Sequence, residues 1–307
     1  MKQNTILIIT GPTATGKTEL AIDIAKKYNG EIISADSMQI YKYLDIGTAK
    51  PTLEEQSKIK HHLIDFVAPN MEYSVQQFVA EADLIIKDLF KKGKLPIIVG
   101  GTGLYIKSLI YPYTFCSAPK DENVRNKYKE MLAKEGKEYI YNLLLDRDSE
   151  AASKIHCNDT KRVIRALEIN ELTGKKKSEL NLEDNNYKYN VIFVALDLPR
   201  EQLYDRINKR VEKMFELGLL SEVKNVISSN LANFDNQSMQ AIGYKEFSSF
   251  FSNEININEL IELISKNSRN YAKRQITFIK GFKDVKWFNP IEERNEIYKF
   301  VEERLKW

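Results

Sequence analysis

The sequence contains Gly11-Pro12-Thr13-Ala14-Thr15-Gly16-Lys17-Thr18, which has the G-x-x-x-x-G-K-T spacing of a phosphate-binding loop. It follows the apolar run 6–9, a predicted buried strand, and precedes the amphipathic stretch 19–28, a predicted helix. Its glycines allow backbone N–H groups to turn inward around phosphate oxygens at the helix N-terminus. We therefore predict a P-loop that binds a diphosphate or a polyphosphate, with Lys17 on the outer phosphates and the Thr18 hydroxyl on a magnesium ion.

The composition is that of an ordinary globular protein. Hydrophobic residues make up 43% and charged residues 29% of the 307 residues, enough for a full core and a second, smaller domain. The longest apolar runs, 6–9 and 95–99, are far shorter than the roughly 20 residues that cross a membrane. No small-residue cleavage site follows the N-terminus, so we expect a cytoplasmic protein without a signal peptide or membrane contact.

Cysteine and histidine usage argues against a zinc site. The sequence has two cysteines, Cys116 and Cys157, which lie too far apart to form a four-ligand site by themselves. The adjacent His61 and His62 point in different directions on a regular element, which favours a structural or hydrogen-bonding pair over a metal-ligand pair. We expect no zinc, and, because no heptad run or exposed apolar helix indicates an obligate oligomer, we expect a monomer.

Two further loops end predicted strands of the same sheet as the P-loop. Asp36 follows the short strand 30–35, and the glycine-rich stretch 100–105 follows the strand 95–99. In a parallel α/β sheet the ligand crevice lies at the carboxyl ends of the strands, so Asp36 and the Thr102 hydroxyl should lie beside the P-loop. The predicted fold is α/β: a P-loop NTPase-like parallel sheet flanked by helices, with a helical insertion domain.

The insertion is predicted from a change of character at about residue 119. Charged helices without a clear strand occupy 120–189. One of them carries Arg162 and Arg165 three residues apart, with Lys161 widening its basic face. We predict an α/β core with C-terminal helices formed by 1–119 and 190–307, and a helical insertion formed by 120–189.

Basic residues gather in several clusters although the net charge is only +3. Arg206 and Arg210 are four residues apart on a predicted helix, so both can point at one anion. A single basic cluster is typical of a solvated face, but several together suggest a polyanionic partner.

Taken together, the motifs resemble those of the bacterial tRNA dimethylallyltransferases. The resemblance covers nearly the whole chain in the right order. It departs at Thr277 to Lys280, where the family usually has Thr-Trp-Phe-Arg. The matching stretches are the P-loop, Asp36 to Tyr41, Thr48 to Pro51, His61 to Asp65, Gly100 to Tyr105, Asn158 to Glu168, Ala241 to Glu246 and Tyr271 to Gln275.

The resemblance implies transfer of a dimethylallyl group from dimethylallyl diphosphate to N6 of the adenosine at tRNA position 37, next to the anticodon, with release of diphosphate. Asp36 would take the proton of the acceptor amine, and Thr102 would position the amine or the bridging oxygen. Lys17, the P-loop backbone, magnesium on Thr18, and Arg206 or Arg210 would neutralise the leaving diphosphate.

The resemblance also implies a tRNA interface, since a stacked anticodon-loop base must be extruded into a pocket to react. Ser37, Met38 and Gln39 would line that pocket, with Gln39 reading a base edge. The insertion would grip the anticodon stem-loop. The complete set of expected tRNA contacts is Asp36, Ser37, Met38, Gln39, Thr102, Arg125, Lys161, Arg162, Arg165, Lys273 and Arg274.

Three other functions use part of the same pattern. A P-loop small-molecule kinase would use Lys17 and magnesium for ATP, and an isopentenyltransferase that acts on free AMP would keep the chemistry but change the acceptor. Neither has an evident use for the basic helix that carries Arg162 and Arg165. An RNA-binding module with a degenerate nucleotide site would not need an intact Lys17, Thr18 and Asp36.

Overall fold

The computed structural model describes residues 4–112, 121–180 and 186–306. The chain forms two compact units, one of residues 1–110 and 187–307 and the other of residues 111–186. The expected domain boundary at 119/120 and Cys116 lie outside the described residues.

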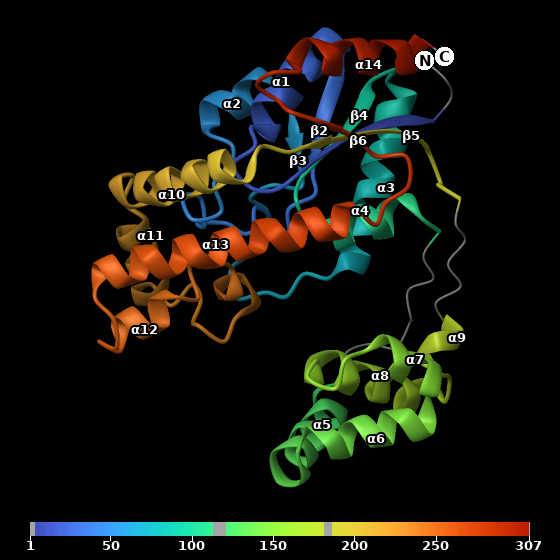
Figure 1. Ribbon diagram of the computed structural model, residues 1–307, viewed down its shortest axis with the longest axis vertical. Helices are drawn as coiled ribbons and strands as arrows, with labels where there is room; N and C mark the ends of the chain where they lie inside the picture. The colour runs from blue at the N-terminus through green and yellow to red at the C-terminus, as the bar shows by residue number, and fades with distance from the viewer. Residues whose placement is uncertain (1–3, 113–120, 181–185, 307) are drawn as a thin grey trace. The chain divides into compact units, whose positions relative to one another are not determined.

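The larger unit is built on a parallel six-stranded sheet (Figure 1). The strand order is β3-β2-β4-β1-β5-β6, and each neighbouring pair is parallel. This confirms the predicted α/β fold. The strands are β1 (Thr5–Thr10), β2 (Gly30–Ser34), β3 (His61–His62), β4 (Leu95–Val99), β5 (Asn190–Leu196) and β6 (Lys286–Phe288).

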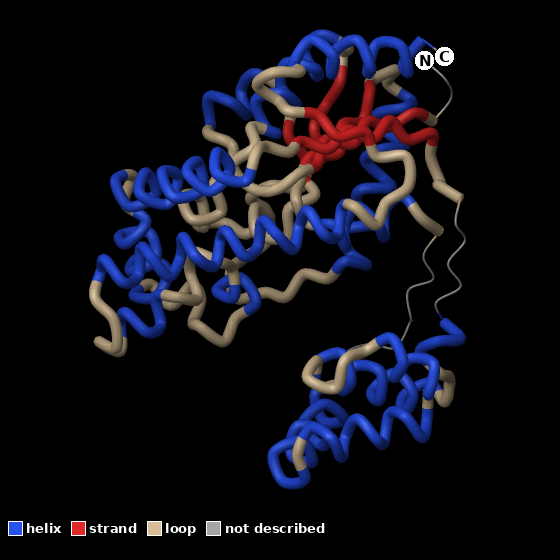
Figure 2. Tube along the Cα trace, in the orientation of Figure 1, coloured by secondary structure: helices blue, strands red, loops and turns tan. Residues whose placement is uncertain are grey.

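Helices cover both faces of this sheet, which is why its central strands are mostly apolar (Figure 2). Every residue of β1 and β4 is buried. Alternate strand residues such as Leu7, Ile97 and Val194 pack with α1 (Lys17–Lys27) and α14 (Arg294–Lys306). The opposite face is covered by α3 (Val75–Lys91), α4 (Gly103–Ile110) and α13 (Ile257–Ile279) (Figure 1).

The C-terminal part of the larger unit is helical. α10 (Arg200–Glu216) packs along α13 (Figure 1). The remaining helices of this unit are α2 (Leu53–Lys58), α11 (Leu219–Ser228), the 3₁₀ helix η1 (Gln237–Gln240) and α12 (Phe247–Phe251).

The smaller unit is a helical bundle with its own core. Tyr128, Ile140, Leu144, Val163 and Leu167 are buried in one apolar cluster. Its helices are α5 (Glu122–Glu135), α6 (Lys137–Arg147), α7 (Ser149–Lys154), α8 (Thr160–Thr173) and α9 (Lys177–Leu180). Over the described parts of both units, every helix is too short or too polar to cross a membrane.

Glu31 links three strands of the sheet. Its carboxylate lies 2.6 Å from Nε2 of His62 on β3 and accepts a hydrogen bond from Nζ of Lys94, which precedes β4. His61 instead places Nδ1 2.8 Å from the Ile59 carbonyl. The histidine pair therefore makes two separate hydrogen bonds, and the described residues contain no cluster of three or more metal-ligating side chains.

Glu31 should make stability depend on pH. Burial raises the pKa of Glu31, but the bonds to Lys94 and His62 outweigh burial and the net pKa is lowered. A carboxyl group with a lowered folded-state pKa stabilises the protein above its unfolded pKa, and the contribution is lost as pH falls through the folded value. We expect Glu31→Gln to reduce the free energy of unfolding at pH 7 by about 2 kcal/mol, with a smaller difference below about pH 4.

Urea unfolding at pH 7 and pH 3.5 measures this effect. The control is Glu54→Gln, because Glu54 is exposed and is paired with Lys58 within one helix. An equal loss of stability in both variants, or a loss that does not depend on pH, contradicts the assignment.

Candidate active site

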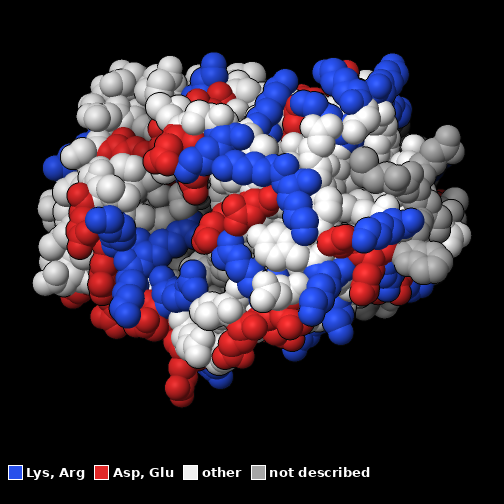
Figure 3. All heavy atoms as spheres, turned by 90° about the horizontal axis from the view of Figure 1, so that it is seen from above, with Lys and Arg blue, Asp and Glu red and all other residues white. Residues whose placement is uncertain are grey.

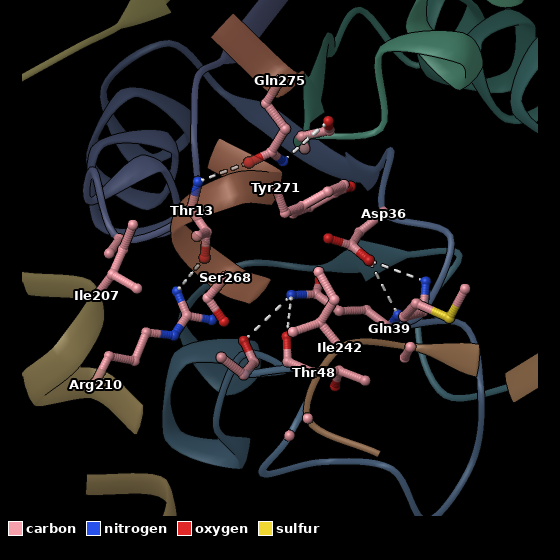
Figure 4. Close-up of a pocket in the computed structure, with 18 of the residues that line it drawn as sticks. Thr13, Asp36, Gln39, Thr48, Ile207, Arg210, Ile242, Ser268, Tyr271 and Gln275 are labelled. Carbon is pink, nitrogen blue, oxygen red and sulfur yellow. Dashed lines mark hydrogen bonds between the residues drawn. The ribbon is translucent and has the colours of Figure 1, made fainter. Parts of the chain in front are cut away.

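A cavity of about 520 Å³ lies at the carboxyl ends of β1, β2 and β4, with α10 and α13 forming further walls (Figure 4). The loops that follow these strands are the three that we expected to meet at one sheet edge. Of the expected site residues, those that line the cavity are Thr13, Ala14, Gly16, Lys17, Thr18, Asp36, Ser37, Met38, Gln39, Arg210 and Arg274.

The loop 11–18 has the backbone shape of a phosphate cradle. Gly11 has φ +140° and Gly16 has φ +84°, and Gly16 directly precedes α1. A Cβ at Gly11 would lie 2.4 Å from the Leu196 carbonyl oxygen, so only glycine fits there. Thr15 Oγ1 donates to the Pro12 carbonyl over 2.9 Å and closes the loop on itself. Gly11, Pro12 and Thr15 therefore shape the loop behind the cavity surface.

Two cationic side chains, those of Lys17 and Arg210, form hydrogen bonds with the P-loop. Lys17 Nζ donates to the Pro12 carbonyl over 2.7 Å, and Arg210 donates to Thr13 Oγ1 over 3.0 Å. The pKa of Lys17 is lowered to about 7, first by burial and then by the charge of Arg210, while the charge of Asp36 opposes the shift. Burial also lowers the pKa of Arg210, again opposed by Asp36. The site thus concentrates positive charge that a bound anion would stabilise.

Asp36 lies across the cavity from Arg210 (Figure 4), and Lys17 lines the same cavity. Its Oδ1 accepts hydrogen bonds from the backbone N–H groups of Met38 at 2.9 Å and Gln39 at 3.4 Å. This turn fixes the carboxylate just beyond the end of β2, as expected from the strand end. Asp36 is therefore held rigidly where a ligand on the P-loop can reach it.

Thr102 contacts the opposite side of the same turn. Its Oγ1 accepts a hydrogen bond from the Ser37 N–H at 3.1 Å. Thr102 is absent from the described residues that line the cavity, but it contacts two residues that do, Ser37 and Tyr271. The side chain of Tyr271 does line the cavity. Burial and the charge of Asp36 raise the pKa of Tyr271 to about 12, while its hydrogen bond with Thr102 opposes the shift.

Gln39, which we expected to read a base edge, is engaged within the protein. Its Nε2 donates to the Thr48 carbonyl at 3.3 Å and the Ala49 carbonyl at 3.2 Å, and its Oε1 accepts from Ser34 Oγ at 3.2 Å. In this structure the amide holds the loop 45–49 against the end of β2.

Glu222 of α11 fixes the same loop from the other side. Its carboxylate accepts hydrogen bonds from three consecutive N–H groups, those of Asp45 and Ile46 at 2.8 Å and of Gly47 at 3.2 Å. The hydroxyl of the buried Tyr244 donates to Glu222 over 2.6 Å. No local sequence pattern predicts these hydrogen bonds, since Glu222 and the loop that it contacts are about 175 residues apart.

A face of α13 that sequence reasoning did not assign also lines the cavity. Ile264, Ser268, Tyr271 and Gln275 recur at spacings of four, three and four residues. This is the period of a single helix face, a signal that the sequence does contain. On α10, Ile207, Val211 and Met214 form an apolar wall on either side of Arg210.

Two expected contacts lie away from the cavity surface. Arg206 is exposed on α10 and is absent from the described lining residues, so of the two α10 arginines only Arg210 reaches the cavity. Lys273 is exposed on α13, with Nζ 5.9 Å from the centre of the Tyr204 ring. Basic and acidic side chains are interspersed over the surface seen in Figure 3.

In the helical unit, two of the expected tRNA contacts pair with a buried acid. The carboxylate of Glu168, 0% exposed, accepts from Arg125 Nε at 2.9 Å and from Arg165 at 2.6 Å. Lys161 and Arg162 are exposed, with Arg162 Nε 3.3 Å from Asp159. Arg125 and Arg165 therefore have a structural role inside this unit.

The fold and site define a P-loop-like α/β protein whose cavity joins an anion cradle to a carboxylate. The family model for IPP transferase matches residues 39–282. The chain belongs to the IPP transferase family, and the resemblance found in the sequence is confirmed.

Relatives match over nearly the full length. The chain is 48% identical to a tRNA dimethylallyltransferase from Thermoanaerobacter sp. (strain X514), covering 98% of each chain. It is 46% identical to one from Caldanaerobacter subterraneus subsp. tengcongensis, covering 98% of this chain and 99% of that relative.

Solved structures of tRNA-modifying transferases have the same fold as this chain. The tRNA isopentenylpyrophosphate transferase from Bacillus halodurans superposes with a TM-score of 0.72 at 39% identity, covering 99% of each chain. A eukaryotic dimethylallyltransferase acting on tRNA superposes with a TM-score of 0.80 at 35% identity, covering 94% of this chain and 74% of that one.

Anion binding should be coupled to the protonation of Lys17. With a pKa of about 7, Lys17 loses its charge above neutral pH in the free protein, whereas a bound diphosphate favours the charged form. We expect the affinity for inorganic diphosphate with magnesium to fall up to about tenfold per pH unit above pH 7, with proton uptake on binding. Calorimetry in buffers of different ionisation enthalpy measures both quantities.

Lys17→Met is the control. Protonation of the diphosphate itself contributes to the measured proton uptake in both proteins, so the difference between them reports on Lys17. The Lys17 assignment fails if the wild-type protein takes up no more protons than this variant.

Proposed function

We propose that this protein is a tRNA dimethylallyltransferase that transfers the dimethylallyl group of dimethylallyl diphosphate to N6 of the adenosine next to the anticodon. The observation that carries the proposal is that Lys17 and Arg210 at the P-loop line the same cavity as Asp36, with Arg210 across from Asp36. The names of relatives at 46% and 48% identity over nearly the whole chain support the same reaction.

The cationic side of the cavity suits the leaving group. Cleavage of the allylic carbon–oxygen bond leaves negative charge on diphosphate, which Lys17, Arg210 and the P-loop N–H groups can stabilise together with the α1 N-terminus. Ile207 and Val211 flank Arg210 in the cavity wall. A diphosphate in contact with Arg210 would therefore have apolar side chains within one helical turn for its five-carbon chain.

The site fits a magnesium ion that is coordinated mainly by the diphosphate. Thr18 lines the cavity, and no cluster of three or more metal-ligating side chains occurs in residues 4–112, 121–180 and 186–306. Magnesium commonly keeps several waters and binds through few protein groups plus substrate phosphates. The Thr18 hydroxyl would hold the ion, which would neutralise charge on the diphosphate.

The carboxylate side of the cavity suits the acceptor amine. Asp36 can accept a hydrogen bond from N6 and take its proton as the new carbon–nitrogen bond forms. Thr102, through its bond to the Ser37 N–H, and Tyr271 would hold this side of the site in place. Met38 and Arg274 line the same cavity and would contact the extruded nucleotide.

We propose tRNA as the macromolecular partner and 120–189 as the unit that grips the anticodon stem-loop. Lys161 and Arg162 are exposed on α8, where they can meet phosphates. Lys273 offers a further exposed cation on α13. A tRNA substrate places the reaction in the cytoplasm, and we propose a monomer without zinc.

The proposal is tested by incubating the purified protein with magnesium and radiolabelled dimethylallyl diphosphate, in parallel with unmodified tRNA, AMP or no acceptor. Label in tRNA alone is the expected result. Label in AMP would assign a nucleotide prenyltransferase. If no acceptor is labelled and the protein consumes ATP supplied in a separate incubation, a kinase would be assigned.

Asp36→Asn should separate catalysis from folding. The amide keeps an oxygen for the Met38 and Gln39 N–H groups but is not a base, so we expect turnover to fall about 10²–10⁴-fold. Binding of tRNA should be nearly unchanged. Single-turnover prenylation and a filter-binding assay measure the two quantities, and wild-type turnover in the variant would rule out Asp36 as the base.

A further inference from the structure

Gln275 joins the P-loop to the loop that follows β4. Its Oε1 accepts a hydrogen bond from the Thr13 N–H at 3.0 Å, and its Nε2 donates to the Gly101 carbonyl at 3.0 Å. The side chain is only 5% exposed, and Figure 4 shows it reaching from α13 to both loops. A buried amide with both ends engaged has one orientation, so it can hold its partners in fixed positions.

The two loops leave space for the Gln275 amide and for no side chain at position 101. A Cβ at Gly101 would lie 2.0 Å from Gln275 Nε2, which means that any other residue at position 101 would displace it. The Thr13 N–H belongs to the phosphate-binding loop, where such groups ordinarily face phosphate oxygens. Here a side chain occupies that donor, so Thr13 cannot offer its N–H to the ligand.

Thr13 also contacts the cation Arg210. With its N–H held by Gln275, the Thr13 hydroxyl accepts a hydrogen bond from Arg210 at 3.0 Å. The pairing holds the guanidinium group at the cavity wall before any anion is bound. A cation fixed in advance loses less freedom on binding than a mobile one.

We propose that Gln275 is a positioning residue that orients Arg210 toward the diphosphate through Thr13, using the Gly101 carbonyl as its anchor. The inference rests on the proposed function, since it takes the P-loop ligand to be a diphosphate. Gln275 itself does not touch the reacting atoms in this scheme, and its effect reaches the ligand only through the loop and the arginine.

The test compares Gln275→Leu with Gln237→Leu. Gln237 makes a matching pair of backbone bonds, accepting from the Tyr73 N–H at 3.1 Å and donating to the Tyr73 carbonyl at 3.0 Å, and it is absent from the described lining residues. Both variants lose two hydrogen bonds. We expect only Gln275→Leu to weaken the binding of inorganic diphosphate with magnesium, by about tenfold in calorimetry. Equal affinities in the two variants would overturn the proposal.

A double-mutant cycle with Arg210→Ala tests the route of the effect. If Gln275 acts through Arg210, Gln275→Leu should weaken diphosphate binding by less than about twofold in the Arg210→Ala background. A full tenfold effect in that background would overturn the relay. Should Gln275→Leu fail to fold, Thr13→Val removes only the hydroxyl that holds Arg210, and wild-type affinity in that variant would equally overturn it.

These outcomes are distinct from failure of the proposed function. If the wild-type protein does not bind diphosphate at all, the proposed donor site is wrong. If the wild-type protein binds diphosphate and prenylates tRNA, and Gln275→Leu binds diphosphate with wild-type affinity, only the role of Gln275 is wrong.

Discussion

The close approach of backbone segments at the carboxyl edge of the sheet is the constraint on which the site depends. A Cβ at Gly100 would lie 2.2 Å from the Ala35 carbonyl oxygen, and one at Gly11 would lie 2.4 Å from that of Leu196. Because these positions lack side chains, the loop after β4 packs against the end of β2, and the P-loop packs against the end of β5. The Thr102 N–H then reaches the Ala35 carbonyl over 3.2 Å. The P-loop, Asp36 and Gly101 consequently line one cavity.

The second constraint is electrostatic. Lys17 and Arg210 are held at the P-loop by neutral oxygen acceptors, while Asp36 lines the same cavity across from Arg210. Burial disfavours both cations, which is why the pKa of each is lowered. Folding therefore places charge where a diphosphate would stabilise it, and that stabilisation grows as negative charge develops on a leaving group. Such an arrangement favours cleavage of a diphosphate ester.

The basic residues of the helical unit have two different roles: some pair with a buried acid, and others remain exposed. Glu168 is fully buried, so its carboxylate requires partners, and Arg125 and Arg165 supply them. Lys161 and Arg162 on the same surface helix point outward and retain their exposure. A sequence pattern of basic residues cannot distinguish these two uses, since both place arginine at helical spacing.

The sequence by itself determined the P-loop between a strand and a helix, and the placement of Asp36 at a strand end, because each of these follows from local spacing and hydrophobic period. Tertiary packing decided which side chains meet across the cavity. It turned Arg210 inward and left Arg206 exposed, engaged the Gln39 amide, and brought Glu222 and Gln275 to loops far away in the chain. These outcomes depend on which face of a helix packs against the sheet edge, and that face is set by contacts between distant segments.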